Sequence, residues 1–474
     1  MKKKLVIAAL ILVLCGAMVF AAGGSQSASG KPTLIWWFIG GTPNNITEGL
    51  KAISDYTESK IGVRVDLKFS GWGEAGQRFQ TIVNSGEYFD LMFTDTGTYG
   101  NFVNLGAFAD ITDMLNSTPA LKNFIPNGLW DGVRVNGRIY SVPTYKDSSK
   151  TDYFVWDDTY LRKYSIDPTK VHTFAELDAA FRKMKSGEGQ RFYPLLLSQS
   201  SLFSSWTYSD FYDDLSLGLP TLGVGFTDNS RKVVSVFEQP EVMDKLRYLN
   251  RWYKDGIINP DAPVVQETPK QLPFFVGQGW PSAAVTWQIN NGVQKYVLEK
   301  VFGPLYSTGT IQGSLNAISA NSRYKNEALK LIELVNTDRK MRDMMGYGIE
   351  GVNFTYVKPT VVHLINDQWN PARYQQGSFF TMSDMEGSEG QWNEVRQQNE
   401  QASQSVLNGF LFDSRSVMNE VTNCKTVVSK YQNELLTGAS DPDVAVPAMM
   451  RDLNAAGFQR IMQEAQRQVD AFKR

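Results

Sequence analysis

Aromatic rings beside glycines are the residues of this sequence with the clearest chemistry. Trp72 stands between two glycines, and the adjacent pair Trp36 and Trp37 lies shortly before a Gly-Gly turn that contains Gly41. A sugar has a flat apolar face edged with hydroxyls, and proteins bind it by stacking aromatic rings on the face and placing planar polar groups at the edge. Because Trp36 and Trp37 are neighbours in an expected strand, their side chains point to opposite faces, and we expect Trp37 and Gly41 to reach a cleft.

Two further tryptophans are candidates at places where the chain turns. Trp287 lies just past an expected strand over Ala283–Val285 and has polar neighbours, so we expect it to face a ligand. Trp206 lies in a serine-rich loop and is a second candidate, although loop aromatics often pack down on a domain. Other tryptophans are interpreted as packing residues: Trp130, Trp156, Trp252 and Trp392.

The polar candidates follow expected strands or lie in a glycine-rich turn: Asp95, Thr96, Tyr145, Lys146, Asp147 and Glu350. Carboxylates, amides and ammonium groups form the hydrogen bonds that the hydroxyl edge of a sugar requires. Two alternatives stay open. Glu350 could instead fix its own turn by accepting backbone amides, and Lys146 with Asp147 could form an exposed ion pair that contributes little.

Motifs for enzymatic chemistry are missing from the sequence. It has no Gly-x-Ser-x-Gly, no His-Glu-x-x-His and no phosphate-binding loop, and its only histidines are His172 and His363. The segment Ser322–Lys325 matches Ser-x-x-Lys without the partner motifs, so a helix N-cap is the better interpretation. The aspartates of residues 210–214 lack the alternating spacing of a calcium loop. We therefore expect no catalytic residue, no metal and no cofactor.

Strands that alternate with amphipathic helices must position these residues. Buried strands are predicted over Thr33–Ile39, Val63–Phe69 and Leu91–Thr94, with helices over Ile46–Thr57 and Gln77–Asn84 between them. This alternation predicts an α/β fold with a parallel sheet covered on both faces. In such sheets ligands bind outside the carboxyl ends of the strands, where Gly41, Trp72 and Asp95 lie.

Later segments predict a second unit. The strand Gly137–Tyr145 runs into a proline and is interpreted as a crossing between units. Helices are predicted over Phe174–Lys185 after the N-cap Thr173, over Pro240–Asp255, and over Lys325–Asn336, where Ser322 begins the helix. Past Ser414 the chain is expected to be helical, with a break at Asp441–Pro442.

The first residues are typical of export. Three lysines precede the apolar run Leu5–Phe20, and Val19-Phe20-Ala21 offers small residues for cleavage, which predicts a signal peptide over residues 1–21 and a flexible tether over 22–30. An alternative is lipidation at Cys15, which Gly16 follows, although the apolar run continues past it. The exported chain is expected outside the cytoplasm, in the periplasm or at the cell surface.

Composition excludes several classes of protein. The 474 residues carry 47 basic and 49 acidic side chains, a net charge of -2, and no basic stripe that would bind nucleic acid. Cleavage leaves Cys424 as the one cysteine, so no intrachain disulfide can form. A chain of this length exceeds one compact core, so two or three domains are expected.

The order of several motifs resembles the extracellular solute-binding proteins of sugar-type ABC importers (family 1). They are the first strand ending in Gly-Gly, Asp90–Thr94, Leu105–Asp110, Gly137–Tyr145, Gly277–Val285 and Asn326–Arg339. In the C-terminal part, Gly346–Val352, Gly409–Asp413 and Tyr431–Pro447 are similar to the LipO-like branch, which has its own C-terminal helical domain. Two features depart from that branch: no conventional lipobox precedes Cys15, and an Asn-containing segment is replaced by Tyr374–Phe380.

The resemblance implies a two-lobe α/β fold of the periplasmic-binding-protein type II, with crossing strands as the hinge and a helical C-terminal extension. The lobes are expected over 31–144 with 306–365, and over 145–305 with 366–474. It further implies a monomer that captures a carbohydrate, in particular an oligosaccharide, between the lobes and delivers it to the permease subunits of an ABC importer. Contact with the membrane would run through the permease or a lipid anchor.

Two other classes of function are compatible with the sequence. A secreted glycoside hydrolase needs two carboxylates facing each other across one cleft, roughly 5 to 9.5 Å apart, which a sequence does not reveal. A non-catalytic surface adhesin would bind a matrix without importing it. Neither alternative is favoured by a motif.

Overall fold

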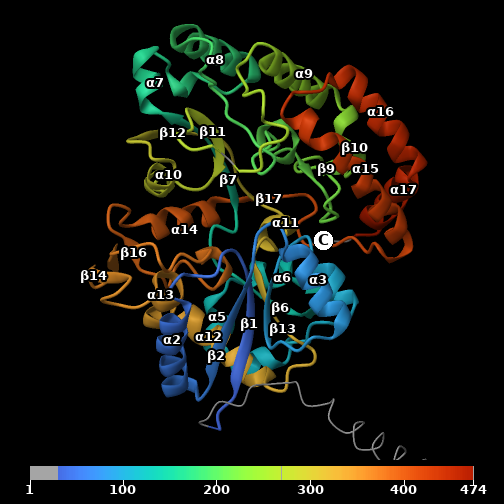
Figure 1. The fold of residues 1–474 in the computed structure, drawn as a ribbon. Helices are drawn as coiled ribbons and strands as arrows, with labels where there is room; N and C mark the ends of the chain where they lie inside the picture. Colours follow the sequence, from blue (N-terminus) through green and yellow to red (C-terminus); the bar gives the residue numbers. More distant parts are fainter. Residues whose placement is uncertain (1–29, 268, 473–474) are drawn as a thin grey trace, which may run out of the picture.

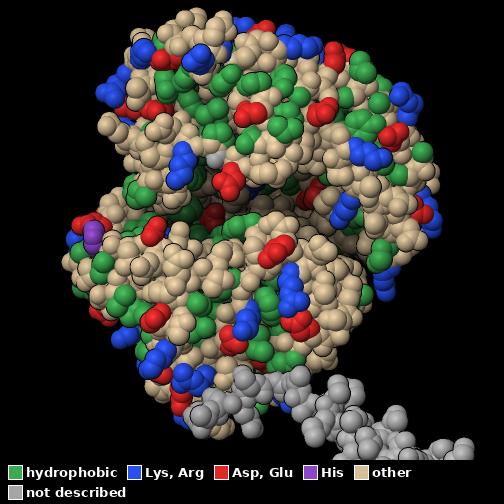
Figure 2. Space-filling model, viewed as in Figure 1, with side chains coloured by type: hydrophobic (Ala, Val, Ile, Leu, Met, Phe, Trp, Pro, Cys, Tyr) green, Lys and Arg blue, Asp and Glu red, His purple; other side chains and the backbone are tan. Residues whose placement is uncertain are grey.

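The computed structural model describes residues 30–267 and 269–472, and it divides into two lobes (Figure 1), with a cleft between them that the space-filling view shows (Figure 2). The lower lobe comprises residues 30–143 and 315–390, and the upper lobe residues 150–306 and 403–472. Three segments connect them: 144–149, 307–314 and 391–402. The expected signal peptide, the tether up to residue 29 and Cys15 lie outside the described residues.

The lower lobe is built on a five-stranded sheet in the order β2-β1-β3-β13-β6. Its strands are β1 Thr33–Ile39, β2 Arg64–Ser70, β3 Leu91–Thr94, β6 Ser141–Pro143 and β13 Leu315–Ile318. The sheet is covered by α2 Ile46–Ile61, α3 Ala75–Ser85, α4 Tyr99–Asn104, α5 Pro119–Phe124, α6 Asn127–Gly132, α12 Lys325–Thr337 and α13 Arg339–Tyr347.

The expectation of a parallel sheet holds for part of this lobe. β1 pairs in parallel with β2, with Thr33 opposite Arg64, and with β3. β13 is antiparallel to both β3 and β6, because the chain re-enters this lobe from above after visiting the upper one. The carboxyl ends of β1, β2 and β3 point toward the upper lobe (Figure 1), so the loops that follow them face the cleft.

Small elements complete the lower lobe. A hairpin of β4 Arg134–Val135 and β5 Arg138–Ile139 precedes β6, and a sheet of β14 Phe354–Lys358, β15 Val361–Leu364 and β16 Asp384–Met385 follows α13. Trp369 packs into the core of this lobe, and Met385 pairs with Val362. The expected boundary at residue 365 was therefore wrong, because residues 366–390 share the core and sheet of the lower lobe.

The upper lobe has a sheet in the order β11-β7-β12-β17. Its strands are β7 Lys150–Asp157, β11 Phe274–Gln278, β12 Tyr296–Tyr306 and β17 Ser403–Gln404, and a smaller sheet is formed by β8 Tyr212–Asp213, β9 Leu222–Gly225 and β10 Val234–Ser235. The helices are α7 Asp158–Lys163, α8 Phe174–Glu188, α9 Pro240–Lys254, α10 Ala283–Asn291, α15 Met418–Leu436, α16 Pro442–Ala455 and α17 Phe458–Ala471.

The C-terminal helices share one core with the rest of the upper lobe. Cys424, Leu453 and Ile461 belong to the same apolar cluster as Trp252 of α9. The break at Asp441–Pro442 is present, since Asp441 caps α16 and Pro442 occupies its first turn. The helical extension is thus an integral part of the lobe rather than a unit with a core of its own.

The connecting segments are tied together by buried polar contacts. In α14 (Gln391–Gln401), the side chain of Asn399 donates to the carbonyl of Lys146 and accepts from the backbone N–H of Ser149, at 2.7 and 3.0 Å. The segment 307–314 contains the short helix α11, Thr308–Ile311. These contacts join two crossings side by side, which is the arrangement expected of a hinge.

Several predicted strands and helix ends can be compared directly with the structure. The strands Thr33–Ile39 and Leu91–Thr94 are confirmed, and Thr173 forms a capping box with Glu176 at the start of α8. The strand expected over Ala283–Val285 was wrong: these residues begin α10, which Gly292 ends in the left-handed conformation. Short apolar runs do not separate strand from helix by periodicity alone.

Candidate functional site

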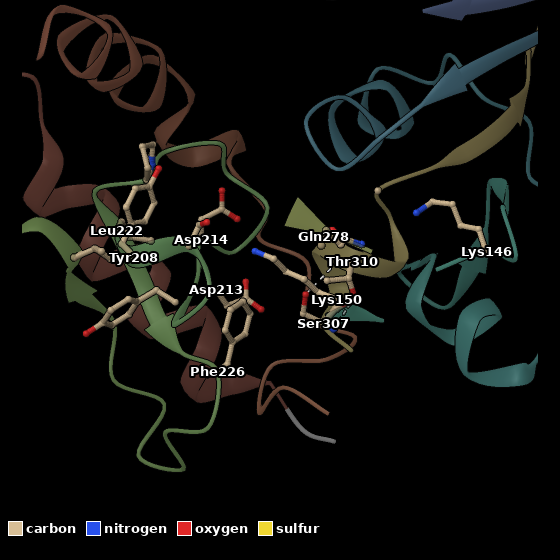
Figure 3. A pocket seen from close by; sticks show the side chains of 16 residues that line it. Lys146, Lys150, Tyr208, Asp213, Asp214, Leu222, Phe226, Gln278, Ser307 and Thr310 are labelled. Carbon is tan, nitrogen blue, oxygen red and sulfur yellow. Dashed lines mark hydrogen bonds between the residues drawn. The ribbon is translucent and has the colours of Figure 1, made fainter. Parts of the chain in front are cut away.

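The surface is hollowed between the two lobes, and acidic side chains are visible in and around the hollow (Figure 2). Within it lies a cavity of about 410 Å³. It is lined by Lys146, Lys150, Tyr208, Ser209, Tyr212, Asp213, Asp214, Pro220, Leu222, Phe226, Val236, Gln278, Ser307, Gly309, Thr310 and Gly313 (Figure 3). Most of these belong to the upper lobe and the rest to the connecting segments, so the cavity is the upper half of the cleft.

A buried ion network forms the floor of this cavity. The ammonium group of Lys150, the first residue of β7, lies 2.5 Å from a carboxyl oxygen of Asp210 and 3.4 Å from one of Asp152. Both aspartates are almost fully buried. Burial raises the pKa of Asp210 to about 7, although Lys150 acts in the opposite direction. Burial acts to lower the pKa of Lys150, but the two aspartates outweigh it and hold that pKa above its ordinary value.

Two adjacent aspartates form the wall above this floor. Asp213 is the last residue of β8, and its Oδ1 accepts a 2.9 Å hydrogen bond from the N–H of Leu215, while Asp214 accepts one of 3.1 Å from Ser216. Burial, followed by the charge of Asp214, raises the pKa of Asp213 to about 7. Figure 3 shows both carboxyl groups turned toward the space that the Lys150 ammonium enters.

The lower side of the cleft is made by the loops after β1, β2 and β3. Gly40 has φ +129°, a conformation that favours glycine, and a Cβ there would lie 3.8 Å from the indole of Trp72. Trp72 is 61% exposed, and its ring therefore covers the Gly40 turn while its other side stays open. Gly41 follows in an exposed position. This edge therefore carries an exposed aromatic ring at the carboxyl end of β2.

The other residues of this edge are held by local hydrogen bonds. Thr96 donates to the carbonyl of Gly309 at 2.9 Å, which joins the loop after β3 to a connecting segment. Asp95 accepts from the N–H of Gly97 at 3.0 Å and so shapes its own turn. Gln375 accepts from the N–H of Ile39 and donates to its carbonyl, at 2.9 and 3.0 Å, and thereby holds Tyr374 against the end of β1.

The structure brings part of the expected set together. Lys146 lines the cavity, is nearly buried, and donates to Asp147 at 2.8 Å, so this pair is not the exposed ion pair of the alternative interpretation. Its ammonium lies 5.9 Å from the centre of the Tyr374 ring. Trp72, Gly41, Asp95 and Thr96 lie at the facing strand ends.

Five expected residues lie elsewhere. Trp37 is in the lower core, where its ring meets Phe79 edge-on, so it points to the packed face of β1. Tyr145 is packed between Phe124 and Phe380 at the connecting segments. For Trp37 the expectation of ligand contact was wrong, because neighbouring core side chains surround its ring. Tyr145 lines a separate cavity of about 230 Å³ with Tyr306 and Asn399, and its contact with a ligand stays a prediction.

The remaining three also have other surroundings. Trp206 packs against Phe154 and Phe211, and Trp287 lies on α10, edge-on to Phe275 and directly over the backbone of Gly277. Glu350 is exposed beside the small sheet of β14 and β15, away from the cavity lining. These positions favour packing for Trp206 and Trp287 and a surface role for Glu350.

Sequence reasoning missed the charged residues in and behind the upper wall of the cavity. Lys150, Asp210, Asp213 and Asp214 were either not considered or set aside as a failed calcium loop. Their signal in the sequence is three aspartates among the aromatic and serine residues of 204–214, a polar content that a buried loop does not need. Their meeting with Lys150, about 60 residues earlier in the chain, depends on tertiary structure.

Neither a metal site nor a membrane span is found in the part of the chain that the structure describes. Across residues 30–267 and 269–472 no group of three His, Cys, Asp or Glu side chains is arranged to hold a metal ion. Over the same residues no helix combines the length and apolar character needed to cross a bilayer.

Comparison with known proteins adds an independent observation. The family model for bacterial extracellular solute-binding proteins matches residues 51–357, and a domain of unknown function (DUF3502) matches residues 406–474. A carbohydrate ABC transporter substrate-binding protein of Streptococcus pneumoniae serotype 4 (strain ATCC BAA-334 / TIGR4) is 24% identical over 481 residues, covering 97% of this chain and 95% of the relative.

Solved structures show the same fold. The N-glycan transport solute binding protein NgtS from Streptococcus pneumoniae superposes with a TM-score of 0.82 at 24% identity, covering 93% of this chain and 99% of NgtS. Its complex with Man1GlcNAc gives a TM-score of 0.81 at 23% identity, with the same coverage. The predicted two-lobe α/β architecture is confirmed by this likeness.

Proposed function

The chain belongs to the bacterial extracellular solute-binding protein family, and we propose that it captures an oligosaccharide in the cleft between its lobes for an ABC importer. The family membership confirms the resemblance seen in the sequence. The observation that carries the proposal is the cleft itself, with polar side chains converging on one side and an exposed tryptophan on the other. That combination suits the hydroxyl edge and the apolar face of a sugar.

The relatives support a carbohydrate as the ligand. The pneumococcal relative is a carbohydrate ABC transporter substrate-binding protein, and the NgtS structure was obtained with Man1GlcNAc. The cavity of about 410 Å³ is within the range of ligand pockets and continues into the open cleft. We infer that one or two sugar rings enter the cavity while further rings extend toward Trp72.

Closure of the lobes completes the site in this proposal. Residues of the upper wall and Trp72 belong to different lobes, so a ligand that contacts both favours the closed form. The closed shape is what the permease subunits would recognise. The short, hydrogen-bonded crossings at Lys146 and Asn399 would absorb the motion.

We propose that the protein binds its ligand without turnover. A glycoside hydrolase would need one carboxyl group to protonate the leaving group and a second to act across the bond. Here the carboxyl groups cluster on the upper wall, while Asp95, at the lower edge, accepts from Gly97 and Thr98 within its own turn. This geometry suits holding a sugar from one side rather than cleaving it.

Export is the natural setting of this function. Members of the family act outside the cytoplasm, and we propose that residues 1–21 direct secretion, with cleavage after Ala21 rather than lipidation at Cys15. Mass spectrometry of the mature protein would find Ala22 at its N-terminus. A diacylglycerol-modified Cys15 at that position would contradict cleavage and make the protein a lipoprotein.

A thermal-shift screen of the mature protein against neutral oligosaccharides tests the proposal. A ligand at 100 times its dissociation constant stabilises the folded state by about 2.7 kcal/mol. Chromatography of the sugar after long incubation should recover it intact. Stabilisation by peptides alone, with no response to any sugar, would contradict the proposal, and a hydrolysed sugar would move the protein to the glycosidases.

A further inference from the structure

The upper wall of the cavity has an excess of acceptors that the proposed function leaves unexplained. We propose that Asp213 and Asp214 make the cleft selective for uncharged oligosaccharides, by accepting hydrogen bonds from ligand hydroxyls and repelling sugars that carry carboxylates. This inference rests on the proposed function and names the class of carbohydrate that it serves.

The first support is an unused acceptor. Asp213 is more than nine-tenths buried and lines the cavity, and its Oδ1 accepts from the N–H of Leu215. The Ser405 hydroxyl lies near enough to act on the pKa of this carboxyl, but Oδ2 has no hydrogen bond of normal length to any described residue. A buried acceptor without a partner is costly, and most native structures avoid it. A sugar hydroxyl in the cavity would supply the missing donor once the carboxyl group turns toward it, because Oδ2 is closed to solvent in this form. An ionised carboxylate only accepts, so its partner must be a group that donates.

The second support is that the nearby cations already face carboxylates or carbonyls, and among them is Lys425 of α15, whose charge acts on Asp214. Lys146 is paired with Asp147 at 2.8 Å, and Lys150 with Asp210. Lys245, behind the wall, lies 3.6 Å from the centre of the Phe211 ring and donates to a backbone carbonyl. An acidic sugar would therefore have to compete with aspartates that are held at short distance.

The third support is the composition of the lining. Carboxylate ligands are commonly bound by arginine, whose planar fork donates two parallel hydrogen bonds. No arginine is present among the described residues that line the cavity. The polar groups there are hydroxyls, an amide, the two paired lysines and the two aspartates. Such a set matches donors and acceptors of neutral sugars and offers no fork for a uronate.

Burial makes a further negative charge beside Asp213 and Asp214 unfavourable. The pKa of Asp213 is raised to about 7 by burial and then by its neighbour Asp214. A uronate beside them would add a third like charge in surroundings that already resist two. A hydroxyl that donates to Asp213 has the opposite effect, because it stabilises the ionised form.

Matched pairs of trisaccharides test the selectivity. The mature protein is titrated calorimetrically at pH 8 with β-mannotriose and trimannuronate, galactotriose and trigalacturonate, and cellotriose and triglucuronate. We expect the neutral member of one or more pairs to bind. Its affinity should exceed that of its acidic counterpart by 30-fold or more. Equal or tighter binding of an acidic member would overturn this inference and leave the carbohydrate proposal standing. Binding of no trisaccharide would count against the proposed function, and this inference would fall with it.

Variants then locate the selectivity. Asp213→Asn and Asp214→Asn keep the shape of the side chain but remove its charge. Each should lower the affinity for the neutral trisaccharide by tenfold or more. Each should also reduce the difference in affinity between the neutral trisaccharide and its acidic counterpart. The control Asp244→Asn removes an exposed charge of α9 in the same lobe. It should change neither the affinity for the neutral trisaccharide nor the ratio of the two affinities by more than twofold. Unchanged selectivity in both cavity variants would overturn the assignment, and their thermal melts without sugar report whether they are folded.

Discussion

The two sides of the cleft are built on different physical principles. The upper wall is a buried network of charges, in which Lys150 is held by Asp152 and Asp210 while Asp213 and Asp214 face the cavity. The lower edge has one exposed ring, Trp72, lying over a glycine turn. We propose that the two regions have different roles, in which the upper wall binds the hydroxyl edge of a sugar and the lower edge stacks on its face. Stability should therefore depend strongly on the first region and little on the second.

The largest expected effect comes from breaking the buried network. Lys150→Met leaves Asp152 and Asp210 buried without their cation and should cost about 3–5 kcal/mol of folding free energy at pH 8. The loss should be smaller at pH 5, where the aspartates can bind protons. Lys68→Met, which removes a half-exposed partner of Asp66, is the control and should cost less than about 1 kcal/mol. Denaturant unfolding measures both. A Lys150 variant as stable as the control would show that the network is not structural.

Two tryptophans sharpen the comparison in the lower lobe. Trp37→Ala should cost about 3–5 kcal/mol of stability, because its ring is packed in the core, and should leave sugar affinity nearly unchanged. Trp72→Ala should do the opposite, with a near-normal melt and an affinity lower by about tenfold or more. Thermal melting and calorimetric titration measure the two properties. If Trp72→Ala melts early and binds normally, the stacking platform is excluded.

The pH dependence of Asp213 gives a smaller effect with a defined sign. Its folded pKa of about 7 lies above the ordinary value of 3.8, so the folded state binds more protons than the unfolded state between these values. Its contribution to stability is therefore most favourable at low pH and declines as pH rises toward 7. Asp213→Asn removes that decline. Its stability relative to the wild type should rise between pH 4 and pH 8, by the order of 1–3 kcal/mol. A constant difference across this range would contradict the raised pKa.

Sugar affinity should also depend on the protonation of Asp213, but it should be highest at high pH, where the contribution of Asp213 to stability is least favourable. Hydroxyls that donate to Asp213 favour its ionised form, so affinity should be constant above about pH 7 and fall below it. The Asn variant should bind weakly at every pH. Calorimetric titrations from pH 5.5 to 8.5 provide the profile, and an affinity that increases on acidification would refute the role of the carboxylate as an acceptor.

The smallest effect is expected outside both regions. Glu350 is exposed beside the β14–β15 sheet, so Glu350→Gln should change stability by less than about 0.5 kcal/mol and affinity by less than twofold. A marked loss of binding would mean that the cleft extends to this sheet on closure and that the division into two sides is incomplete.

Local patterns predicted much of the scaffold. The strand Thr33–Ile39 and the capping box at Thr173 were readable because alternation and capping are short-range signals. Placing Trp72 on an exposed loop also succeeded, since the flanking glycines leave a core ring little support. The helix at Ala283 was missed because a short apolar run fits either element.

The site was predictable only where it followed strand ends. The rule that ligands bind at the carboxyl ends of strands placed Gly41, Asp95 and Thr96 at those ends, where the structure has them, and their contact with a ligand stays a prediction. The prediction that Trp37 contacts a ligand was wrong, because the alternation of a strand shows that neighbouring side chains point to opposite faces but not which face is packed. The upper wall was out of reach, since Lys150 meets Asp210 only through the fold, and a loop rich in aspartate has the same sequence whether it is solvated or buried.

Small-angle X-ray scattering of the mature protein, with and without a saturating neutral oligosaccharide found in the screen, tests the central claim most directly. If the sugar is held between the upper wall and Trp72, the lobes should close on it and the radius of gyration should fall, in a complex of one sugar per protein. Saturated binding with an unchanged radius of gyration would contradict the account, because the ligand would then occupy one lobe alone.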